Sequence, residues 1–260
     1  KEQKNLLKED ELYSSEVFKA IDDLKEDGFL SSNRPSEIIH PQNEYLEYLL
    51  DYKLSKMTLQ ITQQCNFMCS YCPYASISNT TQRKHSDKMM SYETAKKAID
   101  FLIDHSIDSE AINIGFYGGE PLLEYDLIKK CVEYAQMKAM GKKLGFNMTT
   151  NGTLLTLDKI DFISRNDFSI IISLDGPRHV HDKHRRFAAN GCGTFDAIEK
   201  NIISIKNNFP EFFKKISFNV VLDPQDDIGC VNDFFVNYSV FKKMNKWFTI
   251  AQHMRTSLLY

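Results

Sequence analysis

The stretch Ser169-Ile-Ile-Ile-Ser-Leu174-Asp-Gly-Pro177 joins an isoleucine-rich run to an Asp-Gly-Pro turn. A short apolar run that ends at turn residues is typical of a strand in a parallel sheet, and its lack of polar alternation predicts burial on both faces. Similar runs alternate with amphipathic, helix-like segments from Met57 onward, which is the order of parallel βα units. We therefore expect an α/β chain built on a parallel sheet.

The alternation can be followed through most of the chain. Strands are expected at Met57–Thr62, Ala111–Tyr117, Leu144–Thr150, Phe168–Leu174, Ile216–Leu222 and Trp247–Ala251. Helices are expected at Tyr92–His105, Leu122–Met140, Leu157–Arg165, Phe195–Asn207 and Val231–Lys243. Such an order fits an open or partial (β/α)6 barrel of the TIM-like kind, with right-handed crossovers throughout.

A separate helical segment precedes the barrel. Residues 14–30 place Val17, Ile21 and Leu24 on one helical face, and Asp27-Gly28 is a helix-ending pair. The segment looks like the tail of a winged-helix module, which binds peptides by strand addition when it is complete.

A second short helix is expected over Glu44–Asp51, docked on the barrel, because its apolar residues recur at helical spacing. The loop before it contains two prolines and predicts a linker at about residues 31–42. We therefore divide the chain into an N-terminal, winged-helix-like segment with its linker, residues 1–42, and a barrel domain, residues 43–260.

Composition excludes several classes of protein. With 32 basic and 35 acidic residues the net charge is -3, which favours neither nucleic acid nor an anionic membrane as a partner. No apolar run of about 18 residues and no signal-peptide core is present. We expect a cytoplasmic protein.

The six cysteines read better as reduced thiols than as disulfides, since three of them fall within eight residues. The chain begins with Lys1, and Arg255–Tyr260 stops without an evident closing element. We expect it to be a fragment of a longer protein.

Cys65, Cys69 and Cys72 follow the first expected strand at Cys-x3-Cys-x2-Cys spacing. Functional groups of parallel barrels collect at the C-terminal ends of the strands. Iron-sulfur clusters are normally held by four cysteines, so three thiolates leave one iron open to a small molecule with amino and carboxylate groups.

Three other strand ends carry unusual residues, namely Tyr117-Gly-Gly-Glu-Pro121, Thr149-Thr-Asn-Gly152 and Ser173-Leu-Asp-Gly-Pro177. Together with the cysteines they resemble the radical S-adenosylmethionine (radical SAM) superfamily in order and placement. The resemblance covers roughly residues 57–222. It implies that the three cysteines ligate a [4Fe-4S] cluster, whose open iron takes the amino and carboxylate groups of SAM.

The resemblance also implies roles for residues near the cluster. Tyr71 would present its backbone to the adenine, and Gly118, Gly119 and Glu120 would bind the methionine amino group. Residues without a Cβ let the backbone approach a ligand, and a carboxylate can oppose an ammonium charge.

Ser173 resembles a fourth-strand hydroxyl that contacts the cofactor, and Arg185, or alternatively Arg186, resembles the basic residue that meets its carboxylate. Other interpretations of the same residues stay open. Ser173 can be an ordinary buried-strand serine, and Arg185 can be a surface arginine at a helix start.

Simpler interpretations apply to further motifs. Asn151-Gly152 and Asp175-Gly176 are ordinary turn dipeptides, for which we prefer a structural role. His179, His181 and His184 are expected to form a solvated turn.

Zinc is the alternative to an iron-sulfur cluster, with a distant histidine or one of Cys131, Cys192 and Cys230 as the fourth ligand. Cys131 occupies a core-like helical position and is expected to be inert. Cys192 lies in a glycine-rich loop, where a reactive thiol is conceivable.

Within the superfamily, the residues from Leu59 to Pro73 look most like the SPASM/twitch group, and in particular like maturases of ribosomally made, often cysteine-rich peptides. The resemblance then implies an oxidoreductase that reductively cleaves SAM to a 5'-deoxyadenosyl radical, abstracts hydrogen from a peptide and forms a thioether or carbon-carbon crosslink. The implied partners are a precursor peptide of leader and core and a one-electron donor such as flavodoxin or ferredoxin.

The SPASM pattern also has a departure. Those enzymes carry extra clusters in a C-terminal cysteine-rich extension, which this sequence does not show. An anaerobic sulfatase-maturing-type enzyme shares nearly the same motifs, and a radical SAM enzyme for a small molecule or RNA is a further possibility. From another class, a non-catalytic iron-sulfur or zinc module that senses redox state stays open.

Overall fold

The computed structural model describes residues 15–30, 39–72, 74, 85–139, 141–223, 225–241 and 245–250, and for residues 15–17 and 245–250 it describes the backbone alone. The chain separates into two compact units, residues 1–46 and 47–260, which are described one at a time. Most of the expected linker, and the residues after Ile250, lie outside the described part.

The described part of the first unit consists of helix α1 (Ser15–Glu26), a turn, and the short 3-10 helix η2 (Asn43–Tyr45). The helix ends before Gly28, which adopts φ 86°, a conformation that favours glycine. Phe18 and Leu24 are exposed. The expected helix is confirmed here, whereas the winged-helix interpretation stays a prediction.

Helix α2 (Leu46–Tyr52) begins at the boundary and continues into the second unit. Tyr48 donates a hydrogen bond of 2.7 Å to the Asp108 carboxylate, and the Leu54 amide donates to the His105 carbonyl at 2.9 Å. All seven residues of α2 are described and none is buried. Polar contacts therefore tie α2 to the second unit.

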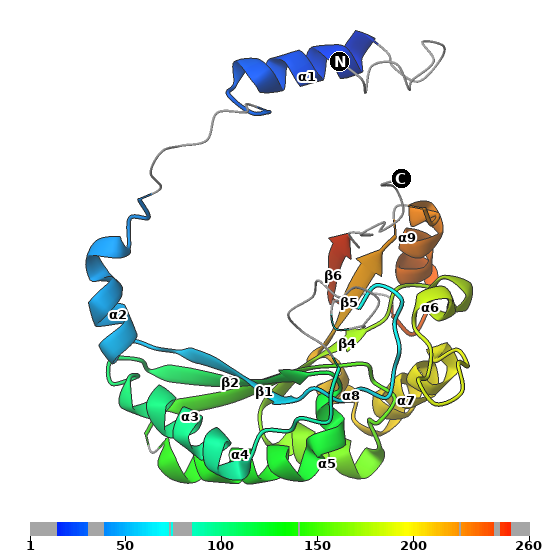
Figure 1. Ribbon diagram of the computed structural model, residues 1–260. Helices are drawn as coiled ribbons and strands as arrows, with labels where there is room; N and C mark the ends of the chain where they lie inside the picture. The colour runs from blue at the N-terminus through cyan, green and yellow to red at the C-terminus, as the bar shows by residue number, and fades with distance from the viewer. Residues whose placement is uncertain are drawn as a thin grey trace. The chain divides into compact units, whose positions relative to one another are not determined.

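A parallel sheet with strand order β1-β2-β3-β4-β5-β6 forms the second unit, and it curves as a partial barrel (Figure 1). Each neighbouring pair is parallel. The strands are β1 (Lys56–Thr62), β2 (Ala111–Gly118), β3 (Lys143–Thr150), β4 (Phe168–Ser173), β5 (Ile216–Leu222) and β6 (Asn245–Ile250). The expected partial (β/α)6 barrel is confirmed.

The helices between the strands also follow the prediction closely. They are α3 (Tyr92–Asp104), the 3-10 helix η3 (Pro121–Glu124), α4 (Tyr125–Lys138), α5 (Leu157–Arg165), α6 (Arg178–His184), α7 (Phe195–Asn208), α8 (Pro210–Phe213) and α9 (Ile228–Asn237). The prediction missed α6 and α8 because both are too short to show a helical period. Helix α9 begins earlier than expected because the Asp227 side chain caps it by accepting from the Cys230 amide.

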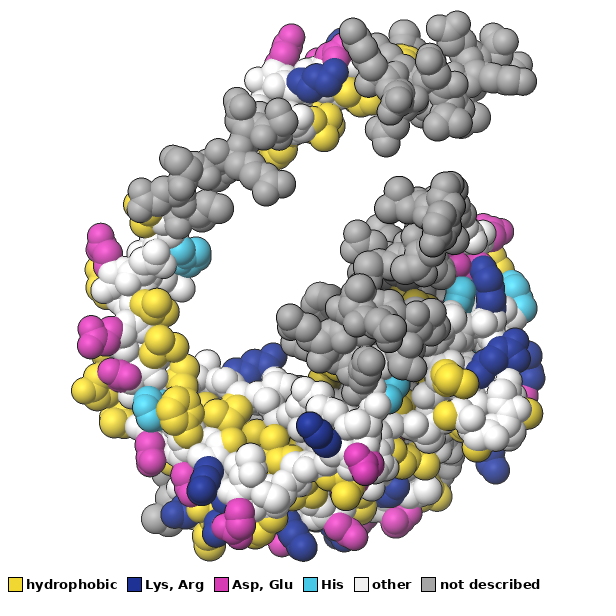
Figure 2. All heavy atoms as spheres, viewed as in Figure 1, with side chains coloured by type: hydrophobic (Ala, Val, Ile, Leu, Met, Phe, Trp, Pro, Cys, Tyr) yellow, Lys and Arg dark blue, Asp and Glu magenta, His cyan; other side chains and the backbone are white. Residues whose placement is uncertain are grey.

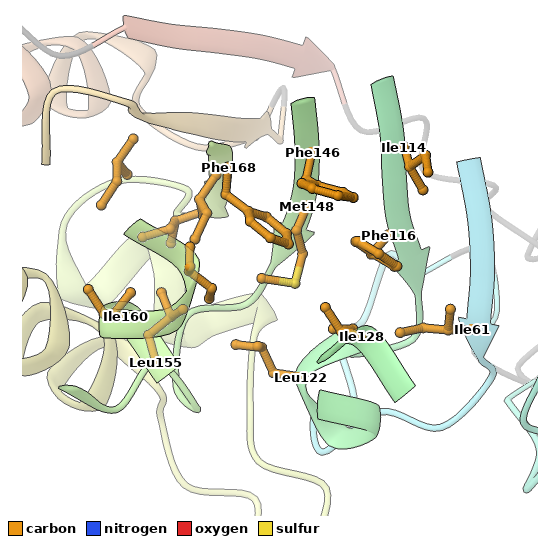
Figure 3. Packing of buried hydrophobic residues seen from close by; sticks show 14 of the residues in the cluster. Ile61, Ile114, Phe116, Leu122, Ile128, Phe146, Met148, Leu155, Ile160 and Phe168 are labelled. Atoms are coloured by element: carbon orange, nitrogen blue, oxygen red, sulfur yellow. The ribbon is translucent and has the colours of Figure 1, made fainter. Parts of the chain in front are cut away.

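The prediction that the strands are buried on both faces is wrong. Along β4, Ile170 and Ile172 are fully buried, Ile171 is half-buried and Ser169 is exposed. In the described part of the chain, the helices between the strands lie on the outer face of the sheet, and that face packs into the core (Figure 1). Figure 3 shows Phe116, Phe146 and Phe168 in this core, and the rings of Phe146 and Phe168 stack at 5.1 Å.

The inner face of the barrel is therefore lined by the other set of strand residues. It includes Tyr117, which is 41% exposed, and the half-buried Asn147 and Asn219. A curved sheet with helices on one side leaves its concave side open, so polar side chains there keep contact with water. The sequence run alone does not distinguish this from burial on both sides.

Basic and acidic side chains are interspersed over the helices on the face shown in Figure 2. Hydrophobic side chains gather on the surface of α2 in the same view. Within the described part of the chain, no helix is both long and apolar enough to cross a membrane.

Candidate functional site

A cavity of about 390 Å³ opens at the C-terminal ends of strands β1 to β5. Its volume is within the range of small-molecule sites. It is lined by Cys65, Phe67, Cys69, Tyr71, Cys72, Tyr74, His85, Tyr117, Gly118, Gly119, Thr149, Thr150, Asn151, Ser173, Arg185, Asn219 and Val221. The structure thus brings together all of the predicted site residues except Glu120.

The cysteine loop, residues 65–72, is held in place by a neighbouring segment, residues 184–188. The Met68 amide donates to the Arg186 carbonyl at 2.9 Å, and the Ala188 amide donates to the Asn66 carbonyl at 2.9 Å. Helix α6 ends at His184, after which the backbone is extended and can pair with the loop. Backbone hydrogen bonds to residues 184–188 therefore help to shape the loop.

The spacing of the three thiols fits a cluster better than one zinc ion. Among the described residues, the one group of three or more potential ligands whose atoms all lie within 4.8 Å is His184, Asp223 and Asp226, so the three sulfurs are more widely spread. A tetrahedral zinc ion, with bonds of about 2.3 Å, would hold its sulfurs about 3.8 Å apart. A cluster that takes each sulfur on a different iron spaces them more widely.

Two of the thiols, those of Cys65 and Cys69, are also poorly ionised at neutral pH. Burial raises the pKa of Cys65 to about 12 and that of Cys69 to about 11, although the positive charge of Arg185 acts in the opposite direction on Cys69. Metal ions bind thiolates, so a bound cluster has to displace these protons. The donor set fits three-point ligation by sulfur.

The other cysteines lie away from the cavity. Cys131 is fully buried in α4, Cys192 is exposed, and Cys230 is half-buried with its Sγ 3.8 Å from His179 Nε2. Of the described residues that line the cavity, none is one of these three. The geometry thus gives no support to zinc held with Cys131, Cys192 or Cys230 as fourth ligand.

Gly118 and Gly119 lie against the backbone that leads into the cysteine loop. A Cβ on Gly118, at φ 149°, would lie 2.2 Å from the Thr62 carbonyl oxygen, and one on Gly119 would lie 2.0 Å from the Gln64 carbonyl oxygen. The Gly119 amide donates a hydrogen bond of 3.0 Å to the Thr62 carbonyl oxygen. Glycine is needed here for close packing of two backbone segments, whichever ligand the cavity takes.

Glu120 is fully buried and is not among the described residues that line the cavity. Its carboxylate accepts hydrogen bonds from the Thr150 hydroxyl at 2.7 Å, the Leu122 amide at 3.0 Å and the Asn151 amide at 2.7 Å. Burial raises the pKa of the carboxyl group, and these hydrogen bonds oppose that effect. Glu120 joins the end of β2 to the end of β3, and its contact with an amino group stays a prediction.

Arg185 is buried against Asp175, so its interpretation as a surface arginine is wrong. Its Nε and Nη2 donate to the two Asp175 oxygens at 2.8 and 3.0 Å. The Tyr71 hydroxyl donates to the same carboxylate, and the guanidinium lies 5.3 Å from the Tyr71 ring centroid. Arg185 lines the cavity, whereas Arg186 is exposed and donates to the Gly191 carbonyl.

The expectation of a solvated histidine turn is correct for His179 and wrong for the other two. His181 is fully buried, with Nε2 3.0 Å from the Thr194 hydroxyl, and its Nδ1 accepts from the Asp175 amide at 3.2 Å. Burial lowers the pKa of His181 to about 4. His184 is 7% exposed and lies behind the cysteine loop. Three histidines in a polar stretch gave no signal of this, because α6 is a single short helix whose buried side is set by tertiary packing.

Several residues of the cavity were not predicted. Asn151 donates from Nδ2 to the Asn66 side chain at 2.7 Å, which connects the end of β3 to the cysteine loop. His85 lies with Nε2 3.5 Å from the Cys72 sulfur and Nδ1 2.9 Å from the Gln63 carbonyl oxygen. Asn151 fell within a strand-end motif that we assigned to a turn, and so did Asp175, which lies behind the cavity-lining Arg185. His85 carried no motif at all.

This chain is similar in sequence to proteins of one known family. The model of the family described as "Radical SAM superfamily" matches residues 59–234. The radical SAM cyclopropyl synthase TigE of Paramaledivibacter caminithermalis is 26% identical over 87% of this chain and 49% of its own length. A cysteine-type anaerobic sulfatase-maturating enzyme of Clostridium novyi is 29% identical over 65% of this chain and 43% of its own.

A solved structure of anSMEcpe with bound AdoMet and Cp18Cys peptide has the same fold. It aligns with a TM-score of 0.64 at 22% identity, over 76% of this chain and 51% of that one. The chain spans about half the length of the curated relatives it matches.

Proposed function

The chain belongs to the radical SAM superfamily, and from this premise we propose that its substrate is a ribosomally made peptide. Members of the superfamily are enzymes that use a [4Fe-4S] cluster and SAM. The observation that carries the cofactor assignment is the cavity lined by Cys65, Cys69 and Cys72. The peptide is supported by the sulfatase-maturating relatives and by the anSMEcpe structure, whose names and contents refer to protein or peptide targets.

In this proposal the three cysteines hold the cluster, and the group supplies hydrogen-atom abstraction when it is bound with SAM. Gly118 and Gly119 present backbone to the ligand, and the Ser173 hydroxyl contacts it. Arg185 meets the ligand carboxylate, with its position fixed by Asp175.

Tyr71 has a defined place in this arrangement. Its hydroxyl is committed to Asp175, which leaves its ring and backbone on the cavity wall. Burial raises the pKa of this phenol, so it stays protonated and keeps donating to the carboxylate. The backbone of Tyr71 is then held ready to contact an adenine.

The remaining partners extend the proposal. Residues 1–42 would contribute to binding a leader peptide and residues 43–260 would carry the reaction, with electrons from a flavodoxin- or ferredoxin-like donor. The cross-link formed would be a thioether or a carbon-carbon bond.

A sulfatase-maturing activity is the second candidate, because enzymes of that name match 65% of this chain. It would act on a cysteine or serine of a protein rather than on a short precursor peptide. Production of formylglycine in a sulfatase-derived peptide, with no crosslink in a precursor peptide, would select it.

The test is anaerobic reconstitution with iron, sulfide and SAM, followed by dithionite and a count of both iron and 5'-deoxyadenosine. We expect about four irons per chain and formation of 5'-deoxyadenosine. Cys69→Ala should lose both, whereas the matched control Cys192→Ala, at an exposed loop position, should lose neither. A full cluster without SAM cleavage would instead identify a non-catalytic redox module.

A further inference from the structure

We propose that His184 is a positioning residue that ties the cysteine loop to the turn after β5, through a hydrogen bond on one side of its ring and close contacts with two aspartates on the other. The proposal rests on the proposed function in one respect, namely that the loop holds the cluster. No predicted role involved this residue, because its position in sequence pointed to a solvated turn.

One side of the ring faces the cysteine loop. His184 Nδ1 lies 2.7 Å from the Ser70 hydroxyl, and the His184 carbonyl accepts from the Ser70 amide at 3.0 Å. Ser70 lies between Cys69 and Cys72, so these two hydrogen bonds hold the centre of the turn that carries the cysteines. The ring also lies 5.5 Å from that of Tyr71.

The other side of the ring faces an acidic turn. His184 Nε2 lies 3.2 Å from Asp223 Oδ2 and 3.5 Å from Asp226 Oδ2. Asp223 directly follows β5, and its Oδ1 accepts from the Gln225 amide at 2.9 Å. The Asp223 side chain thus has a backbone partner of its own, and Asp223 starts from a strand of the main sheet.

The arrangement assigns the protons on the ring. A nitrogen lone pair directed at two carboxylates would be repelled, so Nε2 carries a proton. On the other side of the ring the Ser70 hydroxyl is the partner of Nδ1. A side chain with donor and acceptor atoms on opposite sides of one rigid plane suits this position, and among the common residues only histidine offers it at this length.

Lys183 balances part of the charge of the two aspartates, of which Asp223 is buried and Asp226 half-buried. Lys183 Nζ lies 2.6 Å from Asp226 Oδ1 and 3.3 Å from Asp223 Oδ2. The ammonium already neutralises part of the acidic charge, and its presence next to both carboxylates disfavours a divalent cation at the same place. In this proposal His184 acts as a bridge between the cysteine loop and the turn after β5, rather than as a metal ligand.

The tether can be tested on the cluster-free chain by hydrogen exchange of the loop amides. Replacing His184→Phe removes the ring's contacts with Ser70 and with the two aspartates, while the backbone hydrogen bond to the Ser70 amide remains. We expect exchange over residues 66–72 to become at least tenfold faster. His184→Asn keeps an acceptor near the Nδ1 position and His184→Gln keeps a donor near the Nε2 position, so each should lie between wild type and His184→Phe. Ser70→Ala provides the same test at an exposed residue, where folding is not at risk.

A double-mutant cycle makes the test specific. Ser70→Ala and Asp223→Asn act on opposite sides of the ring and do not touch each other in the proposed bridge. If His184 connects them, either change alone breaks the tether, so the double variant should exchange no faster than the faster single variant. In the His184→Phe variant, neither Ser70→Ala nor Asp223→Asn should change the exchange rate of the loop amides any further.

The reconstituted protein gives a second readout. We expect His184→Phe and Ser70→Ala to lose iron several times faster than wild type and to show an altered cluster EPR signal, with His184→Asn partly restored. Unchanged loop exchange in His184→Phe, or additive effects in the cycle, would overturn the proposal. So would one equivalent of zinc retained by a variant lacking all three cysteines and lost with Asp223→Asn. If wild type binds no iron, the proposed function fails while the exchange test still decides the tether.

Discussion

The buried pair of Asp175 and Arg185 gives the sharpest test of the site's architecture. Asp175 is 1% exposed, and its carboxylate accepts from Arg185, from the Tyr71 hydroxyl and from the Val221 amide. The residue therefore connects the end of β4 with the cysteine loop, the segment after α6, and β5. Replacing Asp175→Asn keeps the shape of the side chain but removes the charge that Arg185 faces.

The expected loss of folding stability in Asp175→Asn follows from the burial of the ion pair. Removing one partner of a buried ion pair costs about 3–5 kcal/mol, because the other charge stays in a poorly solvating place. The asparagine oxygen can still accept one hydrogen bond, so we expect the free energy of unfolding to fall by about 3 kcal/mol. Urea unfolding of the reduced, cluster-free chain, followed by circular dichroism, measures this value.

A matched control uses Asp167, which pairs with Lys215 at 2.7 Å on the surface with a side chain that is 71% exposed. Its replacement Asp167→Asn should cost no more than about 1 kcal/mol. Asparagine also tolerates the positive φ of that position. Equal losses in the two variants would refute the reasoning, since the pair at the cavity would then be as well solvated as one at the surface.

The same pair predicts a pH dependence. Burial acts to raise the pKa of Asp175, but the charge and hydrogen bonds of Arg185 outweigh it and hold the pKa below its usual value. A carboxyl group with a depressed pKa stabilises the fold above its unfolded pKa of about 3.9, and this contribution is lost as the pH falls further. The Asp175→Asn variant should lack that part of the acid-induced loss.

Three further predictions follow from single contacts. Gly119→Ala should destabilise the chain by about 1–3 kcal/mol and weaken iron retention, because its Cβ would overlap the Gln64 carbonyl oxygen; unchanged iron content and unfolding midpoint would contradict this. His181 has a pKa near 4 in the fold against about 6.5 when unfolded, so the unfolded chain binds more protons between these values. Stability should therefore fall by about 3 kcal/mol as the pH drops from 6.5 to 4, and His181→Gln should abolish this slope in urea unfolding. Ile170→Ala should cost about 2–5 kcal/mol and the neighbouring Ile171→Ala clearly less, since only the first side chain is fully buried; equal costs would mean that the inner face of the sheet is packed as well.

Much of the fold was accessible from sequence because its signals are local. The run around Ile170 and its counterparts marked the strands, and capping and turn residues placed most helix ends within a few positions. The prediction that both faces of the sheet are buried was wrong, because a run such as Ser169–Leu174 has the same composition whether helices cover one face of its strand or both. Curvature of the whole sheet decides that point, and it arises from the twist and packing of many strands together.

For the site, the amino-acid sequence by itself determined which cysteines, glycines and strand ends come together at the cavity, because spacing along a chain fixes which residues share a turn. Tertiary structure alone decided which groups hold that turn in place. Asp175 binds Arg185 ten residues away, and His184 meets Asp223 thirty-nine residues further on. Such partners depend on the meeting of separate strand ends at one edge of the sheet, and no local pattern encodes their distances or their burial.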